Sequence, residues 1–381
     1  RLFSFNDKIW CVYPRDFADK AHLEGRAIVP QGDEFVIVAH AEAVAAANDP
    51  GRFSSRVSAH LQIPNGLDGK AHAEARALVD SYLAPGRVET FVPQFHAAAD
   101  QVVGDALSDG AVTDIGALAR LYAVLAMQGW LQWPEHLTQR LLDWIQDNDR
   151  ARVSGDRQWT KRVAEEFDAI IRIAVAEAPV GSETHLLATG HGLSHEEVVS
   201  ILRNWTAGDL GSMARCIEVI AVAFANAPEL QERVRVILGP DGHGAQREFE
   251  AIANEILRID NPFVSNRRVT TCPVDIGQTH IPQGTRVHIH WTGANRDPKV
   301  FEGFDPQGHA EDNLVWGTGP HNCPGKALSM AELRAFWTEA LARCEVVAVN
   351  EAGAKLEGVR SANGGWERSP ARLVRRKTGG E

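Results

Sequence analysis

The residues best suited to bind a metal lie between Trp316 and Gly325, where the chain reads WGTGPHNCPG. A single cysteine, Cys323, stands in this glycine- and proline-rich loop, and a helical pattern of apolar residues follows it directly. Glycines allow tight turns and let the backbone approach a flat ligand closely. Backbone N–H groups near a cysteine at a helix start favour the ionised sulfur, which is the form that binds metals. The loop therefore predicts a thiolate ligand, although most lone cysteines are buried structural residues.

The spacing aromatic-Gly-x-Gly-x-His-x-Cys-x-Gly resembles the haem-ligand loop of the cytochromes P450, with Trp316 where that family usually has phenylalanine. Haem iron accepts a cysteine thiolate, and the electron push from sulfur favours O–O cleavage. The resemblance implies that Cys323 is the metal ligand of haem b (iron protoporphyrin IX). Gly317 and Gly325 would belong to the same haem-binding loop.

A histidine and an arginine four residues apart, His72 and Arg76, share one face of a predicted helix. Most such pairs are solvated surface residues. In the family, a pair at this place hydrogen-bonds a haem propionate, and two buried carboxylates need cationic partners. The resemblance adds His321 and Arg268 to these partners, with Arg267 as a neighbour that the sequence does not exclude.

A long helix is predicted to begin at about His195 and to end near Asn226. The Ser194–Glu197 segment is a capping box, and Pro228 follows the expected end. Two glycines within this helix, Gly208 and Gly211, each cost roughly 1 kcal/mol relative to alanine. Either close helix packing or a flat ligand against the small residues would explain them.

The middle of this helix resembles the oxygen-binding helix of P450s, which usually carries Ala-Gly-x-acid-Thr. Ala207 and Gly208 match, and they are expected to contact the haem. The usual acid and alcohol positions hold no such pair in either possible register. Asp209, Ser212 and Thr206 are the candidates to supply the acid and the alcohol that deliver protons to bound dioxygen. A substrate hydroxyl or water is the alternative to the protein alcohol.

Glu255 and Arg258 lie three residues apart on another helix, about 65 residues before the cysteine. Their position matches the Glu-x-x-Arg pair that supports the loop before the haem in the family. The family's third, basic partner is not evident here. Arg296 and His309 are the nearby basic residues, and the sequence does not decide between them.

The composition excludes several classes of protein. The 381 residues include 39 Lys+Arg and 50 Asp+Glu, so the net charge of −11 disfavours nucleic-acid and anionic-membrane binding. The five cysteines are far apart and form no CxxC pair, which favours a reducing compartment. No apolar run is long enough to span a membrane, and the N-terminus lacks the apolar core of a signal peptide. We therefore expect a soluble, cytoplasmic protein.

The predicted fold is mainly α-helical with a smaller β region, as in the cytochrome P450 fold. The resemblance extends from about residue 34 to residue 375, and residues 1–381 are expected to form a single catalytic domain. The β-rich parts are predicted at about 30–40, 262–292 and 343–375, and the remainder is mainly helical.

The resemblance implies a haem-thiolate monooxygenase that inserts an oxygen atom from O2 into a small organic substrate. Electrons from NAD(P)H would arrive through a separate ferredoxin or flavodoxin-like partner with its reductase, and Lys326 and Arg334 are candidates to dock it. Because the acid–alcohol pair is missing, one alternative is a peroxide-using or non-hydroxylating P450 that couples, dehydrates or rearranges its substrate. Another alternative is a haem-based sensor or carrier of a gas, and a third is a non-haem protein in which Cys323 is structural.

The resemblance also indicates the segments that line the substrate pocket. They mix apolar and polar residues without a charged clamp, which favours a neutral, moderately polar substrate. These segments are Val57–Leu67, Trp205, Val264–Asn266, Thr292 and Asn363–Gly365.

Overall fold

The computed structural model describes residues 13–240, 242, 246–362 and 364–377. Cys11 and Asn363 lie outside the described residues. Contacts divide the chain into two compact units, each built from separate stretches of sequence. The sheet unit comprises Arg1–Ser81, Asn254–Pro324 and Ser361–Gly364; the helix unit comprises Tyr82–Ala253, Gly325–Arg360 and Gly365–Glu381. The single catalytic domain stays a prediction.

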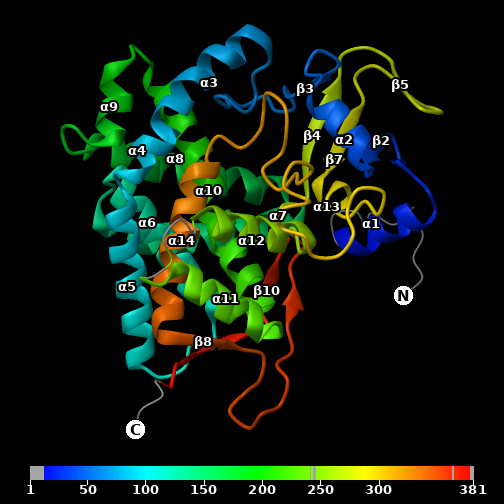
Figure 1. Ribbon diagram of the computed structural model, residues 1–381. Helices are drawn as coiled ribbons and strands as arrows, with labels where there is room; N and C mark the ends of the chain where they lie inside the picture. Colours follow the sequence, from blue (N-terminus) through cyan, green and yellow to red (C-terminus); the bar gives the residue numbers. More distant parts are fainter. Residues whose placement is uncertain (1–12, 241, 243–245, 363, 378–381) are drawn as a thin grey trace. The chain divides into compact units, whose positions relative to one another are not determined.

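The sheet unit is organised around five strands in the order β1-β2-β7-β4-β3 (Figure 1). Strands β2 and β7 pair in parallel, and the other neighbours pair antiparallel. The strands are β1 (Ile28–Gln31), β2 (Glu34–Ile37), β3 (Phe53–Ser54), β4 (Ser265–Thr270) and β7 (Arg286–His290), with β5 (Val274–Ile276) and β6 (Thr279–Ile281) forming a separate hairpin. Its helices are α1 (Pro14–Leu23), α2 (His40–Ala47), α13 (Trp291–Ala294) and most of α3 (Gly69–Leu83); α12 (Gln246–Ile259) passes from the helix unit into it.

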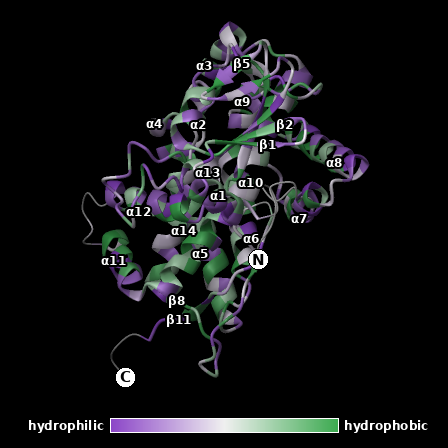
Figure 2. Cartoon of the chain, turned by 90° about the vertical axis from the view of Figure 1, so that its right-hand side faces the viewer, coloured by the Kyte–Doolittle hydropathy of each residue, from purple (hydrophilic) through white to green (hydrophobic). Residues whose placement is uncertain are grey.

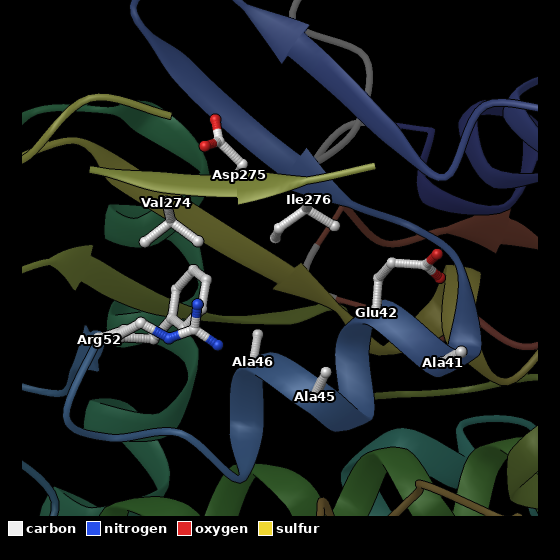
Figure 3. A pocket seen from close by; sticks show the side chains of 9 residues that line it. Ala41, Glu42, Ala45, Ala46, Arg52, Val274, Asp275 and Ile276 are labelled. Atoms are coloured by element: carbon white, nitrogen blue, oxygen red, sulfur yellow. The ribbon is translucent and has the colours of Figure 1, made fainter. Parts of the chain in front are cut away.

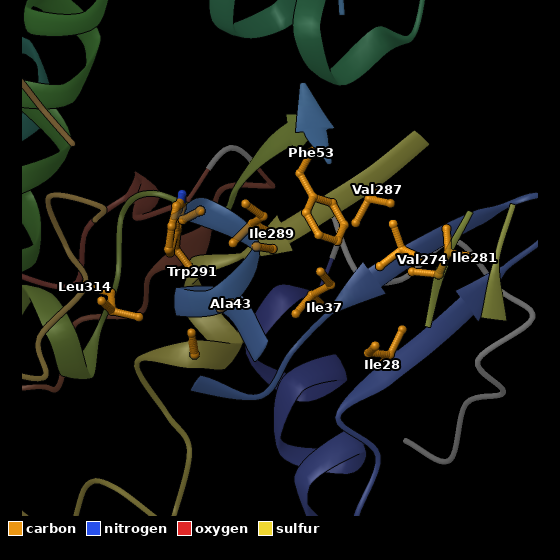
Figure 4. Packing of buried hydrophobic residues seen from close by; sticks show 13 residues of the cluster. Ile28, Ile37, Ala43, Phe53, Val274, Ile281, Val287, Ile289, Trp291 and Leu314 are labelled. Atoms are coloured by element: carbon orange, nitrogen blue, oxygen red, sulfur yellow. The ribbon is translucent and has the colours of Figure 1, made fainter. Parts of the chain in front are cut away.

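Apolar side chains of the sheet and of α2 form the core of the sheet unit. Ile37, Val287 and Ile289 are fully buried on the sheet, and Phe53 and Trp291 pack with them (Figure 4). Successive side chains of a strand point to opposite faces of the sheet. The short apolar runs form strands here because this arrangement buries alternate residues of each run in the cluster. The cluster holds the sheet whose flanking loops carry the predicted site.

The helix unit is built around the long helix α10 (His195–Asn226), which packs against α6, α8 and α14. Hydrophobic residues run along α5 and α14 in Figure 2. Its helices are α4 (Pro85–Glu89), α5 (Val92–Ser108), α6 (Ile115–Leu131), α7 (Thr138–Ser154), α8 (Arg157–Ala176), α9 (Glu183–Gly190), α11 (Pro228–Leu238) and α14 (Lys326–Arg343), with a 3-10 turn at Glu135–Leu137. Its short strands are β8 (Cys344–Val347), β9 (Val359–Arg360), β10 (Trp366–Arg368) and β11 (Arg372–Arg375).

The sequence predicted α10 correctly from its end signals. The Ser194 side chain accepts from the Glu197 N–H, and the Glu197 carboxylate accepts from the Ser194 N–H, so the capping box is complete. The helix ends at Asn226, before Pro228. The mainly helical fold class is likewise confirmed. Strands occur near 30–40, within 262–292 and within 343–375, and the short strand β3 was not predicted.

Within the described part of the chain, no single helix is long and apolar enough to cross a membrane. Helices α10 and α11 satisfy the length and composition test only when taken together, and they are bent by 119° where they meet.

Candidate functional site: a cysteine loop with a histidine–arginine cluster

The backbone of the cysteine loop is folded into successive tight turns. The Cys323 N–H donates to the Trp316 carbonyl at 2.8 Å, and the Asn322 N–H donates to the Gly319 carbonyl at 3.0 Å. Gly317 and Gly319 have φ angles of 69° and 78°, a region that favours glycine. A Cβ atom at Gly319 would lie only 2.5 Å from the Ala47 carbonyl oxygen. The predicted need for glycine in this loop therefore has a steric cause.

Cys323 is a half-buried thiol at the end of these turns. Trp316, seven residues earlier, is fixed because its indole N–H donates to the Asn254 side-chain oxygen at 2.7 Å. Gly325 is the N-cap residue of α14, so the cysteine directly precedes a helix, as the sequence predicted. No cluster of three or more potential metal ligands occurs among the described residues. The role of Cys323 as an iron ligand stays a prediction.

Two histidine rings, one from this loop and one from α3, lie against each other within the sheet unit. The ring centroids of His72 and His321 are 4.0 Å apart. His321 Nε2 is 3.1 Å from the Ser55 hydroxyl and 3.5 Å from an Asp68 carboxylate oxygen. Asp68 is itself held because it accepts from the Ser55 backbone N–H at 3.1 Å. The structure thus brings together two residues that are 249 positions apart in sequence.

Arg76 connects its helix directly to the cysteine loop. Its Nη1 donates to the Pro320 carbonyl at 2.8 Å, and its Nη2 donates to the Asn322 side-chain oxygen at 3.0 Å. Its Nε donates to Asp80 at 2.7 Å. The guanidinium therefore fixes the two residues that flank His321 in the loop.

Arg268 extends from β4 and is buried, whereas its neighbour Arg267 is exposed. The Arg268 Nη1 donates to the Arg267 carbonyl at 2.8 Å, and the described residues provide no carboxylate ion pair for this guanidinium. Burial lowers the pKa of Arg268, and Asp68 partly opposes that shift. Arg268 and Arg267 were the two candidates for the propionate-binding arginine. The burial of Arg268 favours it over the exposed Arg267.

The described residues leave one buried polar atom of this cluster, His72 Nε2, without a hydrogen-bond partner. Burial, reinforced by His72 and Arg268, lowers the pKa of His321 to about 4, and burial also lowers the pKa of His72. A buried polar atom without a partner costs about 1–3 kcal/mol. Carboxylates delivered by a ligand would give a partner to His72 Nε2 and an anion to the buried Arg268 guanidinium, so the residues fit the propionates of haem.

A buried ion pair supports the segment that precedes the loop. Arg258 donates to both oxygens of Glu255, at 2.9 Å and 2.7 Å, and to the Asn295 and Gly303 carbonyls. His309 Nδ1 lies 2.7 Å from the same carboxylate. Burial alone would raise the pKa of Glu255, but these partners together lower it.

His309, and not Arg296, is therefore the basic third partner that the sequence left undecided. Arg296 instead pairs with Asp19 at 2.7 Å and donates to the Ile259 carbonyl.

The small residues of α10 form one exposed face of the helix unit. Ala207, Gly208, Gly211 and Ser212 are half-buried or exposed, while the residues between them are buried. A Cβ atom at Gly208 would meet nothing within 4 Å. Thr206 lies on the buried side, where its hydroxyl donates to the Leu202 carbonyl at 2.7 Å. Ser212 is thus the predicted alcohol that shares the open face with the two glycines.

Asp209 points away from that face, toward α14. It is buried, and its neighbour is Glu332, a second buried acid that no motif in the sequence indicated. Burial raises the pKa of Asp209 to about 7, and burial together with Asp209 raises the pKa of Glu332 well above its usual range. None of their four oxygens has a hydrogen-bond partner of ordinary geometry within the described residues. The two groups are therefore expected to hold at least one proton at neutral pH.

A separate surface hollow of about 220 Å³ lies in the sheet unit between α2 and β5. Val274 and Ile276 point toward the alanines of α2, and Asp275 points away (Figure 3). None of the predicted site residues lines this hollow, so it is not the predicted haem site.

The comparisons with known proteins agree with this geometry. Residues 249–359 match the family model for cytochrome P450. Cytochrome P450 130 of Mycobacterium tuberculosis is 25% identical over 347 residues, which cover 83% of this chain and 82% of that protein. CYP199A2 of Rhodopseudomonas palustris is 24% identical over 361 residues, which cover 89% and 85%. The structure of a mutant of P450 EryK in complex with erythromycin B has a TM-score of 0.81 at 18% identity and covers 100% of both chains.

A mainly helical fold of this kind with a cysteine in such a loop is typical of haem-thiolate enzymes. The family match over residues 249–359, the relatives and the fold together support a P450 monooxygenase with haem b as its cofactor. In this family NAD(P)H supplies the electrons through redox partners.

Proposed function

We propose that this P450 inserts one oxygen atom of O2 into a small organic substrate. The reaction consumes the substrate, O2, two electrons and two protons, and it yields the oxygenated product and water. The observation that carries the proposal is the cysteine loop with its cluster of donors, in which the buried His72 Nε2 has no partner among the described residues. Haem, when bound, supplies the oxygen-activating chemistry.

Each residue of the cluster has a proposed role toward the haem. Cys323 binds the iron through its sulfur, and the turns at Gly317 and Gly319 hold that sulfur in place. His72, Arg76, Arg268 and His321 bind the propionates, because they are the donors gathered beside the loop. Gly325 begins the helix that follows, and Ala207 and Gly208 offer a flat, open surface.

Proton delivery is the least typical part of the proposal. Ser212 is the candidate alcohol, because the Thr206 hydroxyl already donates within the helix. Asp209 lies on the buried side of α10 and acts, in this proposal, as a proton-holding group beside Glu332. This arrangement also favours the second candidate function, in which hydrogen peroxide supplies both oxygen and electrons and little proton delivery is required.

The optical spectrum of the haem-loaded protein tests the proposal. The wild type should show thiolate-ligated haem, and Cys323→Ser should lose that spectrum. The melting temperature of the haem-free protein should hardly change, because Cys323 is only half-buried. A thiolate spectrum retained in Cys323→Ser would show that another residue binds the iron.

The oxidant is tested separately with any substrate that shifts the haem spin state. Turnover with NAD(P)H, a ferredoxin and its reductase supports the monooxygenase route. Turnover with peroxide alone supports the second candidate, and the two rates can be measured on the same preparation.

We also propose that a separate ferredoxin or flavodoxin-like protein delivers the electrons, with Lys326 at its docking site. Lys326 is exposed at the start of α14, three residues after the cysteine. Arg334 is a poorer candidate, because only 13% of its side chain is exposed and it lies 3.5 Å from Glu89. Lys326→Glu should slow reduction by an acidic ferredoxin about tenfold at low salt. The control Lys161→Glu on α8 should leave the rate unchanged, and equal rates in all three proteins would remove this docking site.

A further inference from the structure

We propose that Arg215 of α10 binds a carboxylate group of the substrate, so that the substrate is an organic acid. This inference rests on the proposed function and names the substrate class for the open face of α10. It differs from the neutral substrate that the sequence favoured, because Arg215 was not among the segments expected to line the pocket. Every contact used below lies within the helix unit.

Arg215 occupies the same helix face as the small residues. It stands one turn after Gly211, and its guanidinium folds back over that glycine. A Cβ atom at Gly211 would lie 3.6 Å from both Nη1 and Nη2. The aliphatic stem is held from the other side, since a Cβ atom at Gly365 would lie 3.6 Å from Cβ and Cγ of Arg215. The guanidinium is thus held in place at the end of the open face of α10.

One side of this guanidinium lacks a partner. Nη1 contacts one oxygen of Asp149, on α7, at 3.3 Å, which is longer than the usual 2.7–2.9 Å of a charge-assisted hydrogen bond. Nε is buried and has no hydrogen-bond partner within the described residues. Arginine binds carboxylates in two parallel hydrogen bonds, and the Nε–Nη2 edge can do so while Nη1 stays with Asp149.

The groups around Arg215 leave its positive charge largely uncompensated. Glu218, on the same helix, is buried, and burial raises its pKa to about 8 despite the opposing effect of Arg120 and Arg215. It is therefore mostly protonated at neutral pH. Asp149 is 39% exposed, so solvent screens its charge. An incoming carboxylate would supply a second anion beside Asp149.

A second arginine on α10, Arg203, has a guanidinium that is fully paired with a carboxylate of the protein. Arg203 donates from Nε and Nη2 to the two oxygens of Asp168, at 2.7 Å and 3.2 Å. Its carboxylate-binding edge is already used by the protein. Arg203 is thus a matched control, on the same helix and with similar exposure, whose role is structural.

The test is an optical titration of the haem-loaded protein with matched pairs of ligands. The probes are laurate and phenylbutyrate, each compared with its methyl ester, which removes the negative charge and adds one methyl group. We expect the acids to shift the haem spin state with a Kd about tenfold to a hundredfold lower than that of the esters. Arg215→Gln should remove this preference, and Arg203→Gln should retain it.

The outcomes separate this inference from the proposed function. If no thiolate haem spectrum forms, the proposed function fails first. If the spectrum forms but the acids bind no better than the esters, or neither binds, the inference is overturned. The comparison of acid with ester in the wild type requires no variant, so it holds even if Arg215→Gln folds poorly. Isothermal calorimetry of the same pairs gives a readout independent of the spin state.

Discussion

The cysteine-loop cluster of the sheet unit and the α10 helix of the helix unit differ in how closely they follow the family pattern. The loop holds its residues in tight turns, and its donors converge from three separate stretches of sequence. Helix α10 keeps the small residues but places its acid on the buried side. The part that would hold the cofactor is therefore typical, while the part that would handle protons and substrate is specific to this chain.

The largest expected effect is on the support behind the loop. Arg258→Ala leaves the Glu255 carboxylate buried without its main partner and removes bonds to two carbonyls. Breaking a buried ion pair costs about 3–5 kcal/mol, so chemical denaturation should show a loss of that size. The surface pair of Arg140 and Glu166 provides the control, since Arg140→Ala should cost less than about 1 kcal/mol. Similar losses in both variants would mean that the buried pair has no special structural role.

The next effect concerns the acids between α10 and α14. Burial raises the pKa of Asp209 in the folded protein to about 7, above its ordinary value. The fold therefore favours the protonated carboxyl group, and ionisation of Asp209 at higher pH lowers the free energy of unfolding. Stability should fall as the pH rises from about 4 through neutrality. Asp209→Asn removes the ionisation and should raise the free energy of unfolding at pH 8 by about 1–3 kcal/mol.

Denaturation curves at several pH values measure this dependence. Asp105→Asn, at an exposed position of α5, should follow the wild-type pH profile. If Asp209→Asn also keeps that profile, Asp209 is charged in the fold and the proton-holding role is wrong.

A smaller effect is expected for haem retention. His72→Phe removes the donor whose Nε2 atom has no partner in the described chain, while it keeps an aromatic ring against His321. One charge-assisted hydrogen bond contributes about 1.5–3 kcal/mol, so haem should leave roughly ten times faster or more. Haem transfer to a globin acceptor measures this rate, and His60→Phe, at an exposed loop position, is the control. An unchanged release rate would exclude a propionate contact at His72.

These two regions also show what the sequence was able to predict. The loop and the fold class followed from a motif, because the positions of Gly317 and Gly319 are dictated by local backbone geometry. Helix α10 was predicted from its capping box and the following proline. Such local features require no knowledge of distant residues.

The partners of buried charges were not predictable in the same way. Glu332 and Asp209 are 123 positions apart, and helix packing alone makes them neighbours. The choice of His309 over Arg296 likewise depends on the loop fold around Glu255. Arg215 was overlooked because its unsatisfied edge is visible only after Asp149 and Gly365 are placed. A search for charged residues at i+3 and i+4 from the glycines would have found it.

The smallest expected effect tests why α10 keeps a glycine at its centre. Alanine at position 208 meets no atom within 4 Å, so Gly208→Ala should stabilise the haem-free protein by up to about 1 kcal/mol through helix propensity. If the open face receives a flat ligand, the same methyl group should weaken haem binding. Gly129→Ala, on α6, would place its methyl group 3.2 Å from the Gln94 side chain and should show no gain in stability. Gly208→Ala that stabilises both the haem-free and the haem-loaded protein equally would show that the glycine serves neither the haem nor the substrate.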